Sequence, residues 1–507
     1  MKSARFLSRS RKPFGTHTRR QLRRKHFHRD PSMPVQNNLI NGTWTAGSDT
    51  LRSINPSDTN DVVGEFAVAS SEQVRDAIAA ARAALPAWVG TTTQMRSDLL
   101  HNVGAELLAR KEELGDLLAR EEGKTRAEAI GEVTRAAQVF RFFAGEVVRY
   151  GGERLPSVRP GLEIEVSRQP VGVVGIITPW NFPIAIPAWK IAPALAFGNT
   201  VVFKPSERTP ALGWALADII VRTSAPAGVF NLVMGAGPVG DAMLDGVDAV
   251  SFTGSVATGR HVAKRGVERM IPVQAEMGGK NPLVVLDDAD LTTAVNCAVD
   301  GAFFQTGQRC TASSRLIVTE SIHDRFVDAV SQRLRGLVVD HALKAGTQCG
   351  PVVDQRQLDQ DLRYMEIGKS EGATPKVMGE LLSRDTPGFY LSPTLFVDTT
   401  NRMRINREEI FGPVACVIRV KDYDEALSVA NDTDFGLSAG ICTTSMKHAR
   451  HFQSNAQSGL TMTNLPTAGL DYHVPFGGTK ASSYGPREQG RYAVEFYTIS
   501  KTSYIAI

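Results

Sequence analysis

The stretch "FFQTGQRCTASSR", residues 303–315, contains a single cysteine, Cys310, among small and polar residues. An arginine, Arg309, directly precedes it, and no second cysteine lies within the thirty residues that follow. A thiolate is a strong nucleophile for a carbonyl carbon, and it works best when no second thiol shares its site. A lone cysteine is equally compatible with a buried, inert thiol, so the rest of the chain must decide between the two.

The other cysteines and the histidines favour no disulfide framework and no metal centre. The chain has five cysteines, an odd number, and none of them is arranged with CxxC spacing. This usage argues against both disulfides and a zinc site and suits a reducing compartment. The ten histidines contain no HxxxH pair, so no metal ion is expected. Cys297, Cys416 and Cys442 lie in apolar runs and are predicted to be core residues.

Two polar side chains stand in surroundings that require an explanation. Asn181 lies in "TPWNFP", residues 178–183, between two prolines and two aromatic residues, where its amide must find a partner or act as a donor. Glu276 lies in "QAEMGGKNP", residues 274–282, where an apolar strand meets a Gly-Gly turn, a suitable place for a buried general base. A rigid buried turn around Asn181 and an exposed Glu276 are the alternatives.

Three turns between predicted strands and helices could hold a dinucleotide. "GAGPVG", residues 235–240, matches the GxGxxG pattern, but Pro238 stands where a helix-opening amide should bind pyrophosphate, and a simple tight turn is an equal alternative. In "SFTGSVATG", residues 251–259, the Ser255 hydroxyl and backbone amides at a helix start could bind phosphate. In "FKPSE", Glu207 follows a strand, where an acid can bind ribose hydroxyls.

The segments that must position these residues alternate between strand and helix. Ser70 and Gln73 fit a capping box that starts a helix, and helical structure is expected to continue to about residue 149. Residues 161–180 have the pattern of extended chain, first alternating and then continuously apolar. From there, Val- and Ile-rich segments alternate with helical ones, which predicts buried parallel sheets in an α/β architecture.

Length and composition limit the classes to which the protein can belong. At 507 residues the chain is long enough for two or three domains. Hydrophobic residues at 42% and charged residues at 22% are ordinary values for soluble proteins. The apolar runs are broken well short of eighteen residues, so no transmembrane helix is expected.

The formal net charge of +4 comes from the N-terminal tail. Residues 1–32 contain eleven Lys or Arg and one acid, and the rest of the chain carries 46 basic and 52 acidic residues, a net charge of −6. The body of the protein therefore has no reason to attract nucleic acid. We expect residues 1–32 to form a basic, disordered tail with no folded role. A mitochondrial-type transit peptide, or a translated leader ahead of a start at Met33, fits the same composition.

Six motifs, in this order and spacing, resemble the aldehyde dehydrogenase superfamily: "TPWNFP", "FKPSE", "FTGS", "EMGGKNP", "GQRC" and "EEIFGPV". The resemblance covers the chain from about residue 36 to its end. It implies an α/β fold with two parallel-sheet domains and a β-strand arm for oligomerisation. The NAD(P)-binding domain would comprise residues 33–150 and 171–278, the catalytic domain residues 279–483, and the arm residues 151–170 and 484–507.

The resemblance implies a role for each motif residue. Cys310 would attack the aldehyde to give a thiohemiacetal, and the Asn181 side-chain amide and the Cys310 backbone N–H would hold its oxyanion. Hydride would leave to the nicotinamide, and Glu276 would activate the water that hydrolyses the resulting thioester. The implied cofactor is NAD or NADP, bound by Thr178, Trp180, Lys204, Ser206, Glu207, Gly237, Ser255, Glu409 and Phe411.

Within the superfamily, the C-terminal third looks most like α-ketoglutaric semialdehyde dehydrogenases, in residues 350–373, 465–478 and 482–498. That resemblance implies oxidation of 2,5-dioxopentanoate to 2-oxoglutarate. Thr479 and Ala481 depart from the arginine and glycine expected of that group. Another semialdehyde, or a neutral aliphatic or aromatic aldehyde, is the alternative substrate.

A substrate with a carboxylate needs a cation in the substrate tunnel. Arg135 is predicted to supply it, because it shares with Gln138 and Phe142 one face of a helix that lines the tunnel in the family. Arg309 is the second candidate for that cation, and Phe182 is the third predicted substrate-binding residue. A surface Arg135, and an Arg309 that holds its own loop in place, are the alternatives.

The resemblance also implies partners and leaves three choices open. Arm strands cover their edges against a neighbouring subunit, so a homodimer or homotetramer is expected. The expected location is cytoplasmic, or the mitochondrial matrix if residues 1–32 are a transit peptide. Glu207 favours NAD, whereas Lys204 and Ser206 could hold the 2′-phosphate of NADP. A CoA-acylating enzyme would lack Glu276, and a non-catalytic protein of this fold would lack the nucleophile.

Overall fold

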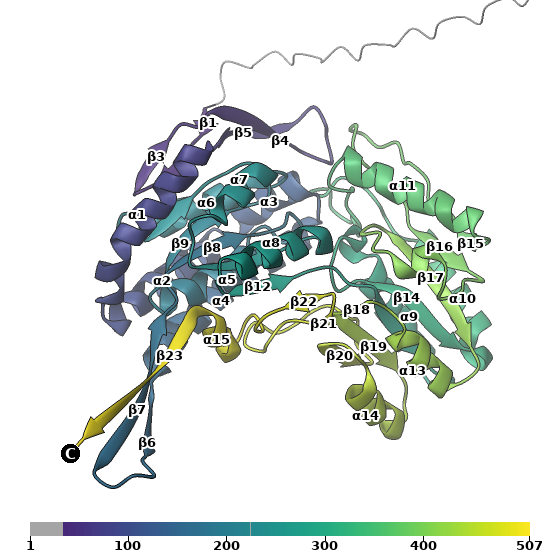
Figure 1. Ribbon diagram of the computed structural model, residues 1–507. Coiled ribbons are helices and arrows are strands. Elements are labelled where there is room, and N and C mark those ends of the chain that lie inside the picture. The colour runs from purple at the N-terminus through teal and green to yellow at the C-terminus, as the bar shows by residue number, and fades with distance from the viewer. Residues whose placement is uncertain (1–33, 224) are drawn as a thin grey trace, which may run out of the picture. The chain divides into compact units, whose positions relative to one another are not determined.

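The computed structural model of the chain describes residues 34–223 and 225–507. The predicted basic tail, residues 1–32, lies outside the described residues. Two large sheets with helices around them make up most of this part of the chain (Figure 1). None of the described helices is both long and apolar enough to span a bilayer.

The first large sheet, within the described residues, has eight strands. Its five middle strands run parallel, and a short antiparallel strand or pair of strands closes each edge. In spatial order, the strands are β22 (Ser483–Tyr484), β12 (Val273–Glu276), β11 (Ala249–Thr253), β8 (Val173–Ile177), β9 (Thr200–Lys204), β10 (Phe230–Leu232), β2 (Asn38–Ile40) and β3 (Thr43–Thr45).

The strand order of this sheet reverses at β8. The chain runs from β8 to β9 and β10 on one side, and then crosses to β11 and β12 on the other. Open α/β sheets bind ligands at such a switch point, in the crevice outside the carboxyl ends of the strands. Residues 178–184, which contain the "TPWNFP" motif, follow β8, and Gly254 and Ser255 follow β11. The topology therefore brings two of the predicted motifs to one edge of the sheet.

The second large sheet has seven strands in the described part of the chain. All neighbouring pairs are parallel except β15 and β16. In spatial order, the strands are β15 (Thr374–Val377), β16 (Thr394–Val397), β17 (Val414–Val420), β14 (Ser313–Thr319), β13 (Asn281–Val285), β19 (Ser438–Cys442) and β20 (Leu460–Thr463).

The chain passes from the first sheet to the second within residues 277–280, between β12 and β13. Glu276 is the last residue of β12. Cys310 precedes β14, and Glu409 precedes β17, so both stand before the N-terminal ends of neighbouring parallel strands. Thus the first sheet carries its motifs at the carboxyl ends of its strands, whereas the second sheet carries Cys310 and Glu409 before the amino ends of its strands.

Helices cover both faces of the first sheet because its strand side chains alternate between two hydrophobic cores. Val174 and Ile176 pack with α2, α4, α5 and α6, whereas Val173 and Ile177 pack with α1, α7 and α8. These helices are α1 (Ser71–Val89), α2 (Thr93–Ala109), α3 (Lys111–Glu122), α4 (Arg126–Arg149), α5 (Ala185–Ala196), α6 (Pro210–Arg222), α7 (Gly237–Met243) and α8 (Val256–Glu268).

The second sheet is covered in the same way. Leu283 and Val285 pack with α9 and α10, and Val284 packs with α13 and α14. The remaining helices are α9 (Leu291–Ala302), α10 (Glu320–Arg335), α11 (Gln355–Ser370), α12 (Arg404–Arg407), α13 (Tyr423–Asn431), α14 (Met446–Asn455) and α15 (Val494–Tyr497).

The predicted helix start at Ser70 is confirmed. The Ser70 hydroxyl accepts the Gln73 backbone N–H at 3.2 Å, and the Gln73 side chain accepts the Ser70 N–H at 3.0 Å. This reciprocal pair satisfies two backbone donors that the first turn of a helix leaves without partners. Thr125 and Glu128 start α4 with the same capping box.

Three smaller sheets complete the described part of the chain. They are β1 (Val35–Gln36), β5 (Val62–Val68) and β4 (Asp49–Ile54); β18 (Phe435–Gly436) and β21 (Thr479–Lys480); and β23 (Thr498–Ala506), β7 (Leu162–Pro170) and β6 (Glu153–Pro156). The sheet of β6, β7 and β23, called the arm below, extends away from the two large sheets (Figure 1). It joins the two segments predicted to form the arm, while the predicted domain boundaries and its role in oligomerisation stay predictions.

Candidate active site

Cys310 differs from the other four cysteines, all of which lie in the described part of the chain. Those four are buried, whereas Cys310 is partly exposed. It lines two separate cavities, one of about 560 Å³ and one of about 230 Å³. The predicted core positions of Cys297, Cys416 and Cys442 are confirmed. A thiol in the wall of two cavities can meet a ligand from either side.

The backbone just before Cys310 is held in a rare conformation. The 3₁₀ segment η1 (Phe304–Gly307) contains consecutive positive φ angles, from 52° at Gln305 to 67° at Gly307. For a residue other than glycine, this left-handed conformation costs about 1–3 kcal/mol, so neighbouring groups must maintain it. The Glu128 carboxylate of α4 accepts the Gln305 backbone N–H at 3.0 Å. This contact ties the loop of Cys310 to α4.

The thiol of Cys310 is protonated at neutral pH in the absence of ligands. Burial, together with the Glu409 and Glu276 carboxyl groups, raises the pKa of the Cys310 thiol to about 12, while its own backbone N–H and Arg309 lower it. The thiolate, and not the thiol, attacks a carbonyl carbon. A base must therefore take the thiol proton before or during attack.

The larger cavity lies at the switch point of the first sheet. Its wall includes residues that follow β8, β9 and β11, and it is completed by residues that precede β14 and β17 of the second sheet. Every residue predicted to bind the cofactor lines it: Thr178, Trp180, Lys204, Ser206, Glu207, Gly237, Ser255, Glu409 and Phe411. The structure thus brings together motifs that lie more than two hundred residues apart in the sequence.

One end of this larger cavity carries Lys204 and Glu207. Lys204 is buried at the end of β9, and its Nζ donates to the carbonyls of Gly235, at 2.7 Å, and Pro205, at 3.0 Å. The Glu207 carboxylate lies 3.8 Å from that Nζ, and its side chain is 46% exposed. An exposed acid beside a buried, partly engaged lysine can accept hydrogen bonds from sugar hydroxyls.

The middle of the larger cavity offers hydroxyl groups. Ser255 is the N-cap of α8 and accepts the Thr258 backbone N–H. The hydroxyls of Thr178 and Thr253 line the cavity and are buried, with no hydrogen-bond partner among the described residues. Buried hydroxyls usually have partners, so a ligand rich in oxygen atoms fits this wall.

The end of the larger cavity nearest Cys310 is formed by the "EEIFGPV" and "EMGGKNP" motifs. The Glu409 carboxylate accepts the Gly279 backbone N–H at 2.9 Å, and burial raises the pKa of Glu409 to about 7. A Cβ atom at Gly278 would lie 2.1 Å from a Glu409 oxygen, so a larger residue there would have to displace the Glu409 carboxylate from its present position. Phe411 packs edge-to-face against Trp180, with ring centroids 5.5 Å apart.

The smaller cavity contains the three residues predicted to bind substrate, Arg135, Phe182 and Arg309. Arg135 is mostly buried, and it donates to the Leu470 carbonyl and, at 3.0 Å, to the Gln489 side chain. Its Nε has no hydrogen-bond partner among the described residues. Burial lowers the pKa of Arg135, although arginine stays charged near neutral pH.

Arg309 is held differently from Arg135. Its Nη2 donates to the carbonyls of Asp300, at 2.5 Å, and Gly301, at 2.9 Å, near the C-terminal end of α9. Backbone carbonyls at a helix C-terminus are good partners for a cation. Arg309 therefore fastens the loop that carries Cys310, which is the alternative role considered for it.

Asn181 lies beside the loop that carries Cys310. Its side chain is buried in the wall of the larger cavity, and its Nδ2 donates to the Gln308 carbonyl at 3.0 Å. An amide nitrogen carries two hydrogens, so one N–H is left for a ligand. The structure thus places an amide donor next to the segment of the predicted nucleophile.

Glu276 is placed behind the cavity walls. It is buried at the end of β12, is absent from the described residues that line either cavity, and accepts the Ser483 hydroxyl at 2.5 Å. Burial and then the nearby Glu488 carboxyl raise the pKa of Glu276 well above its ordinary value, against the effects of Ser483, Lys190 and Arg487. A carboxyl group with a raised pKa suits a general base that works near neutral pH.

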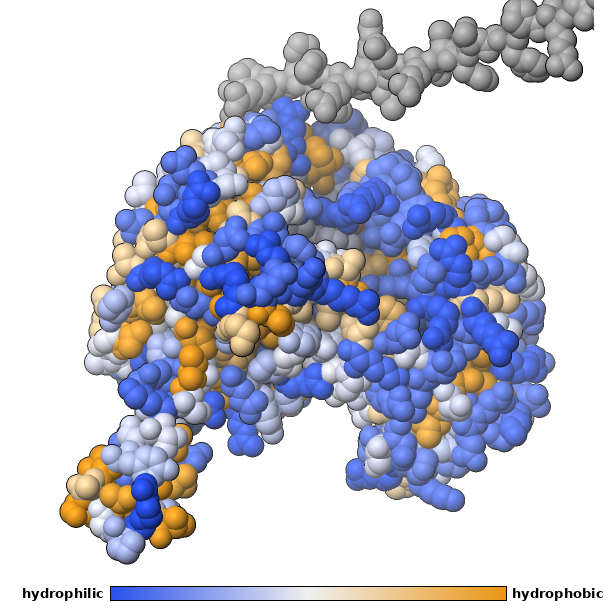
Figure 2. All heavy atoms as spheres, viewed as in Figure 1, coloured by the Kyte–Doolittle hydropathy of each residue, from blue (hydrophilic) through white to orange (hydrophobic). Residues whose placement is uncertain are grey.

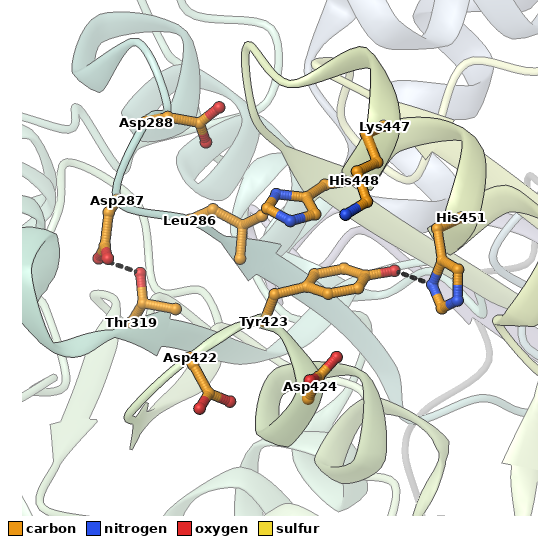
Figure 3. Close-up of a pocket in the computed structure, with 10 residues that line it drawn as sticks. All are labelled: Leu286, Asp287, Asp288, Thr319, Asp422, Tyr423, Asp424, Lys447, His448 and His451. Atoms are coloured by element: carbon orange, nitrogen blue, oxygen red, sulfur yellow. Dashed lines mark hydrogen bonds between the residues drawn. The ribbon is translucent and has the colours of Figure 1, made fainter.

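A further cavity, also of about 560 Å³, lies elsewhere on the second sheet and contains none of the predicted site residues (Figure 3). Tyr423 stacks on His448 with ring centroids 4.5 Å apart, and its hydroxyl meets Nδ1 of His451 at 2.7 Å. Within residues 34–223 and 225–507, no three His, Cys, Asp or Glu side chains are placed to hold a metal ion. Without a nucleophile or a metal group, this cavity is a weaker candidate than the two at Cys310.

Comparison with known proteins identifies the family. Residues 44–503 match the model of the aldehyde dehydrogenase family. The chain belongs to that family. It is 42% identical to the α-ketoglutaric semialdehyde dehydrogenase of Bacillus subtilis, over 92% of this chain and 97% of the relative. It is 40% identical to the 2,5-dioxopentanoate dehydrogenase of Saccharolobus solfataricus, over 91% and 97%.

Solved structures give the same result for the fold of this aldehyde dehydrogenase. The betaine aldehyde dehydrogenase of Staphylococcus aureus, solved in complex with NAD⁺, aligns with a TM-score of 0.90 at 34% identity, over 93% of this chain and 95% of that one. The predicted family resemblance and the predicted α/β aldehyde dehydrogenase fold are confirmed. The role of each individual site residue stays a prediction.

The sequence analysis did not identify some of the side chains that shape the site of this aldehyde dehydrogenase. Lys190 is fully buried in α5, where its Nζ donates to the Ser251 hydroxyl at 2.9 Å and pairs with Glu488. A single lysine inside the apolar helix "AIPAWKIAPALA" was a usable signal, because a lysine is almost never buried without a partner. Ser483, the partner of Glu276, gave no comparable signal.

Proposed function

We propose that this aldehyde dehydrogenase oxidises 2,5-dioxopentanoate to 2-oxoglutarate through a thioester on Cys310, with NAD or NADP as the oxidant. The observation that carries the proposal is the position of Cys310 in the walls of two cavities. One cavity collects every predicted cofactor residue, and the other collects every predicted substrate residue. Relatives named for this substrate, at 40% to 42% identity, support its choice.

The chemistry proceeds in two stages at Cys310. The thiol loses its proton to a base, and the sulfur adds to the aldehyde carbon. The resulting oxyanion accepts hydrogen bonds from the Asn181 amide and the Cys310 backbone N–H, donors aimed where the charge develops. Loss of hydride from the same carbon leaves a thioester.

Hydrolysis of the thioester requires Glu276. Its carboxylate takes a proton from water, the water oxygen adds to the thioester carbon, the C–S bond breaks, and the sulfur regains a proton. Because Glu276 lies behind the wall and is bound to Ser483, its side chain must turn toward Cys310 to reach that water. In sum, an aldehyde and water become a carboxylate, and two electrons pass to the cofactor.

The residues of the larger cavity fit a nicotinamide dinucleotide. Lys204, Ser206 and Glu207 would hold its adenosine end, Ser255 its pyrophosphate, and Glu409 with Phe411 its nicotinamide ribose. The bound nicotinamide supplies the hydride acceptor. Two of the three Lys204 donors already bond to carbonyls, and the Glu207 carboxylate would repel a 2′-phosphate. Both observations favour NAD over NADP.

Arg135 supports an acidic substrate. A carboxylate that enters the smaller cavity loses its hydration and must meet a charged donor there. Arg135 is mostly buried in that wall, and its Nε is not used by any described residue. Arg309 also has an Nε without a partner among the described residues, but its Nη2 ties the loop of Cys310 to the end of α9, so we rank it second.

The arm supports assembly with further copies of the chain. Its exposed apolar side chains are conspicuous in the space-filling view (Figure 2) and include Leu155, Val158, Ile499, Tyr504, Ile505 and Ile507. Exposed apolar residues next to unpaired strand edges favour contact with another subunit. We infer a homodimer or homotetramer, in the cytoplasm or, if residues 1–32 are a transit peptide, in the mitochondrial matrix.

Steady-state kinetics with a small panel tests the function. We expect kcat/KM to be higher for 2,5-dioxopentanoate than for a neutral aldehyde of the same chain length, and higher with NAD than with NADP. The reaction should need no CoA. A preference for the neutral aldehyde would contradict the substrate, and a requirement for CoA would contradict hydrolysis by Glu276.

A further inference from the structure

A buried charged cluster lies behind the segment that carries Asn181. Its centre is Lys124, in the sequence "EEGKT" between α3 and α4, where Gly123 ends α3 with a φ of 97°. Lys124 is 1% exposed. A buried lysine is costly unless its ammonium is fully paired, so its partners indicate what the residue is for.

The ammonium of Lys124 reaches the main chain of Asn181. Nζ donates to the Asn181 carbonyl at 2.7 Å and to Oε2 of Glu132, in α4, at 2.6 Å. It also lies over the Phe182 ring, 4.2 Å from the centroid. Thus one cation touches two consecutive residues, the predicted oxyanion donor and a predicted substrate contact.

Glu132 holds the other end of the same segment. Its second oxygen, Oε1, accepts the backbone N–H groups of Ile184 and Ala185, each at 3.1 Å, where α5 begins. A carboxylate satisfies the free amides of a first helical turn well. The Lys124–Glu132 pair therefore holds residues 181–185 at both ends.

The charges in this cluster balance when one acid is neutral. Burial raises the pKa of Glu122 to about 8, which leaves it protonated at pH 7. Burial lowers the pKa of Lys124, but the Glu122 and Glu132 carboxyl groups outweigh that effect and raise it overall. Lys124 and Glu132 then form one cation and one anion, so neither charge is buried without a partner.

The Asn181 side chain depends on this support. Its amide is fastened on the side of the Cys310 loop by a single bond, to the Gln308 carbonyl. A shift of Asn181 by a fraction of an ångström would move its free N–H away from the oxyanion, and oxyanion donors act only over a narrow range of distance. The contact that prevents such a shift on the main-chain side is the one from Lys124.

We propose that Lys124, held by Glu132, is a positioning residue that fixes the Asn181 amide for oxyanion stabilisation at Cys310. The proposal rests on the proposed function, because it assumes that Asn181 is the oxyanion donor. It assigns Lys124 no contact with the substrate or the cofactor. Its effect should appear in the first chemical stage, when the thiohemiacetal forms and is oxidised.

The main variant removes the pair as a unit. Lys124→Met alone would leave the Glu132 charge buried without a partner, whereas Lys124→Met with Glu132→Gln removes both charges and keeps Oε1 for the Ile184 and Ala185 amides. We expect a melting temperature within a few degrees of wild type. The pre-steady-state burst of reduced cofactor should slow by about 10- to 100-fold, with the dissociation constant for NAD unchanged.

A matched control separates positioning from the substitution of a buried carboxyl group elsewhere. Glu121 is as buried as Glu132 and accepts the backbone N–H groups of Ala211, at 2.7 Å, and Leu212, at 3.0 Å, where α6 begins. Glu121→Gln should therefore leave the burst rate unchanged. Alkylation of Cys310 by iodoacetamide should proceed at the wild-type rate in every variant, because Lys124 acts on the oxyanion donor and not on the thiol.

A double-mutant cycle with Asn181→Ala decides the matter. If Lys124 acts through Asn181, the paired substitution should slow the burst of Asn181→Ala by less than about threefold. Effects that multiply, an unchanged burst in the paired variant, or an equal loss in Glu121→Gln would each overturn the proposal and leave the proposed function intact. If the paired variant melts far below wild type, Lys124→Arg, which keeps the charge but displaces the donors, enters the same cycle.

Failure of the proposed function would look different. If Asn181→Ala itself leaves the burst at the wild-type rate, Asn181 is not the oxyanion donor. That result would remove the assigned role of Asn181 and, with it, the basis of the Lys124 proposal.

Discussion

The two cavities that meet at Cys310 are built in different ways. The larger one is lined by short motifs at the ends of strands, and its wall combines hydroxyl groups with charged side chains that come from many different segments. The smaller one draws Glu128, Glu132 and Arg135 from one helix and combines them with loops from distant parts of the chain. The charged side chains of the smaller cavity thus come mainly from one helix.

This difference leads us to expect that the larger cavity serves the reaction common to all aldehydes and that the smaller cavity selects among them. A crevice at a switch point follows from the topology of the sheet, and the residues at the strand ends decide which ligand it binds. A cavity supported by buried charges depends on which charges are paired inside the protein and which remain for a ligand. We therefore expect substitutions around the larger cavity to affect all aldehydes alike, and substitutions around the smaller one to distinguish between them.

The largest effect should come from the residue that both cavities share. Cys310→Ala should reduce turnover to below about one-thousandth of wild type with every aldehyde, because the methyl group removes the attacking sulfur. Fluorescence titration should show unchanged binding of NAD, since the larger cavity keeps its other residues. Substantial turnover in this variant would disprove the thioester mechanism.

Glu276 lies outside both cavities and should affect only the second stage. Glu276→Gln should lower the steady-state rate by about 10²–10⁴-fold and leave the burst of reduced cofactor intact. Rapid mixing with absorbance at the reduced-nicotinamide band resolves the two phases. If burst and steady state fall together, Glu276 acts at or before oxidation of the thiohemiacetal.

Arg135 tests whether the smaller cavity selects the substrate. A charge-assisted hydrogen bond contributes about 1.5–3 kcal/mol, so Arg135→Ala should lower kcat/KM for 2,5-dioxopentanoate by about 10–150-fold. Neutral aldehydes of similar length should be nearly unaffected. Arg141→Ala, at an exposed arginine on the same helix, is the matched control. Equal losses for acidic and neutral substrates would refute the assignment, and Arg309 should then be tested.

The smallest effect concerns Glu409 in the larger cavity. Its pKa of about 7 in the folded protein lies above its ordinary value of 4.5, so the unfolded chain ionises first as pH rises. Glu409 therefore lowers the free energy of unfolding progressively between about pH 4.5 and pH 7. Urea unfolding without cofactor should show Glu409→Gln gaining on wild type by on the order of 1 kcal/mol from pH 5 to pH 8. A constant difference across that range would contradict the raised pKa.

Much of the architecture could be predicted because it depends on neighbouring residues. The capping box at Ser70 and Gln73 requires only a three-residue spacing, and the buried strands β8 and β9 reveal themselves as continuous Val- and Ile-rich runs. The residues predicted to bind the cofactor stand in short motifs that could be recognised locally, and their role stays a prediction. The resemblance to the family then implied a role for each of these motifs.

The supporting residues could not be predicted in this way. Glu276 was expected to be a buried base, but its bond to Ser483 joins β12 to β22, two strands that are about two hundred residues apart in the sequence. Lys190 and Glu488, which also meet, are 298 residues apart in the sequence. Nothing in the local sequence of either residue specifies the other, because the pairing depends on how the sheet edge and α5 pack together.

The sequence by itself determined the family, and through that resemblance it predicted the main participants in the reaction: a lone nucleophilic cysteine, an amide in an apolar turn, an acid at a strand end and a dinucleotide site. Only the tertiary structure decided that Cys310 lies in the walls of two cavities, that Arg309 holds a loop, and that Lys124 reaches the main chain of Asn181. The physical reason is the separation in sequence between the residues that make each contact. Strands, caps and turns are set by contacts between near neighbours, whereas a buried charge takes its partner from whichever segment the fold packs against it.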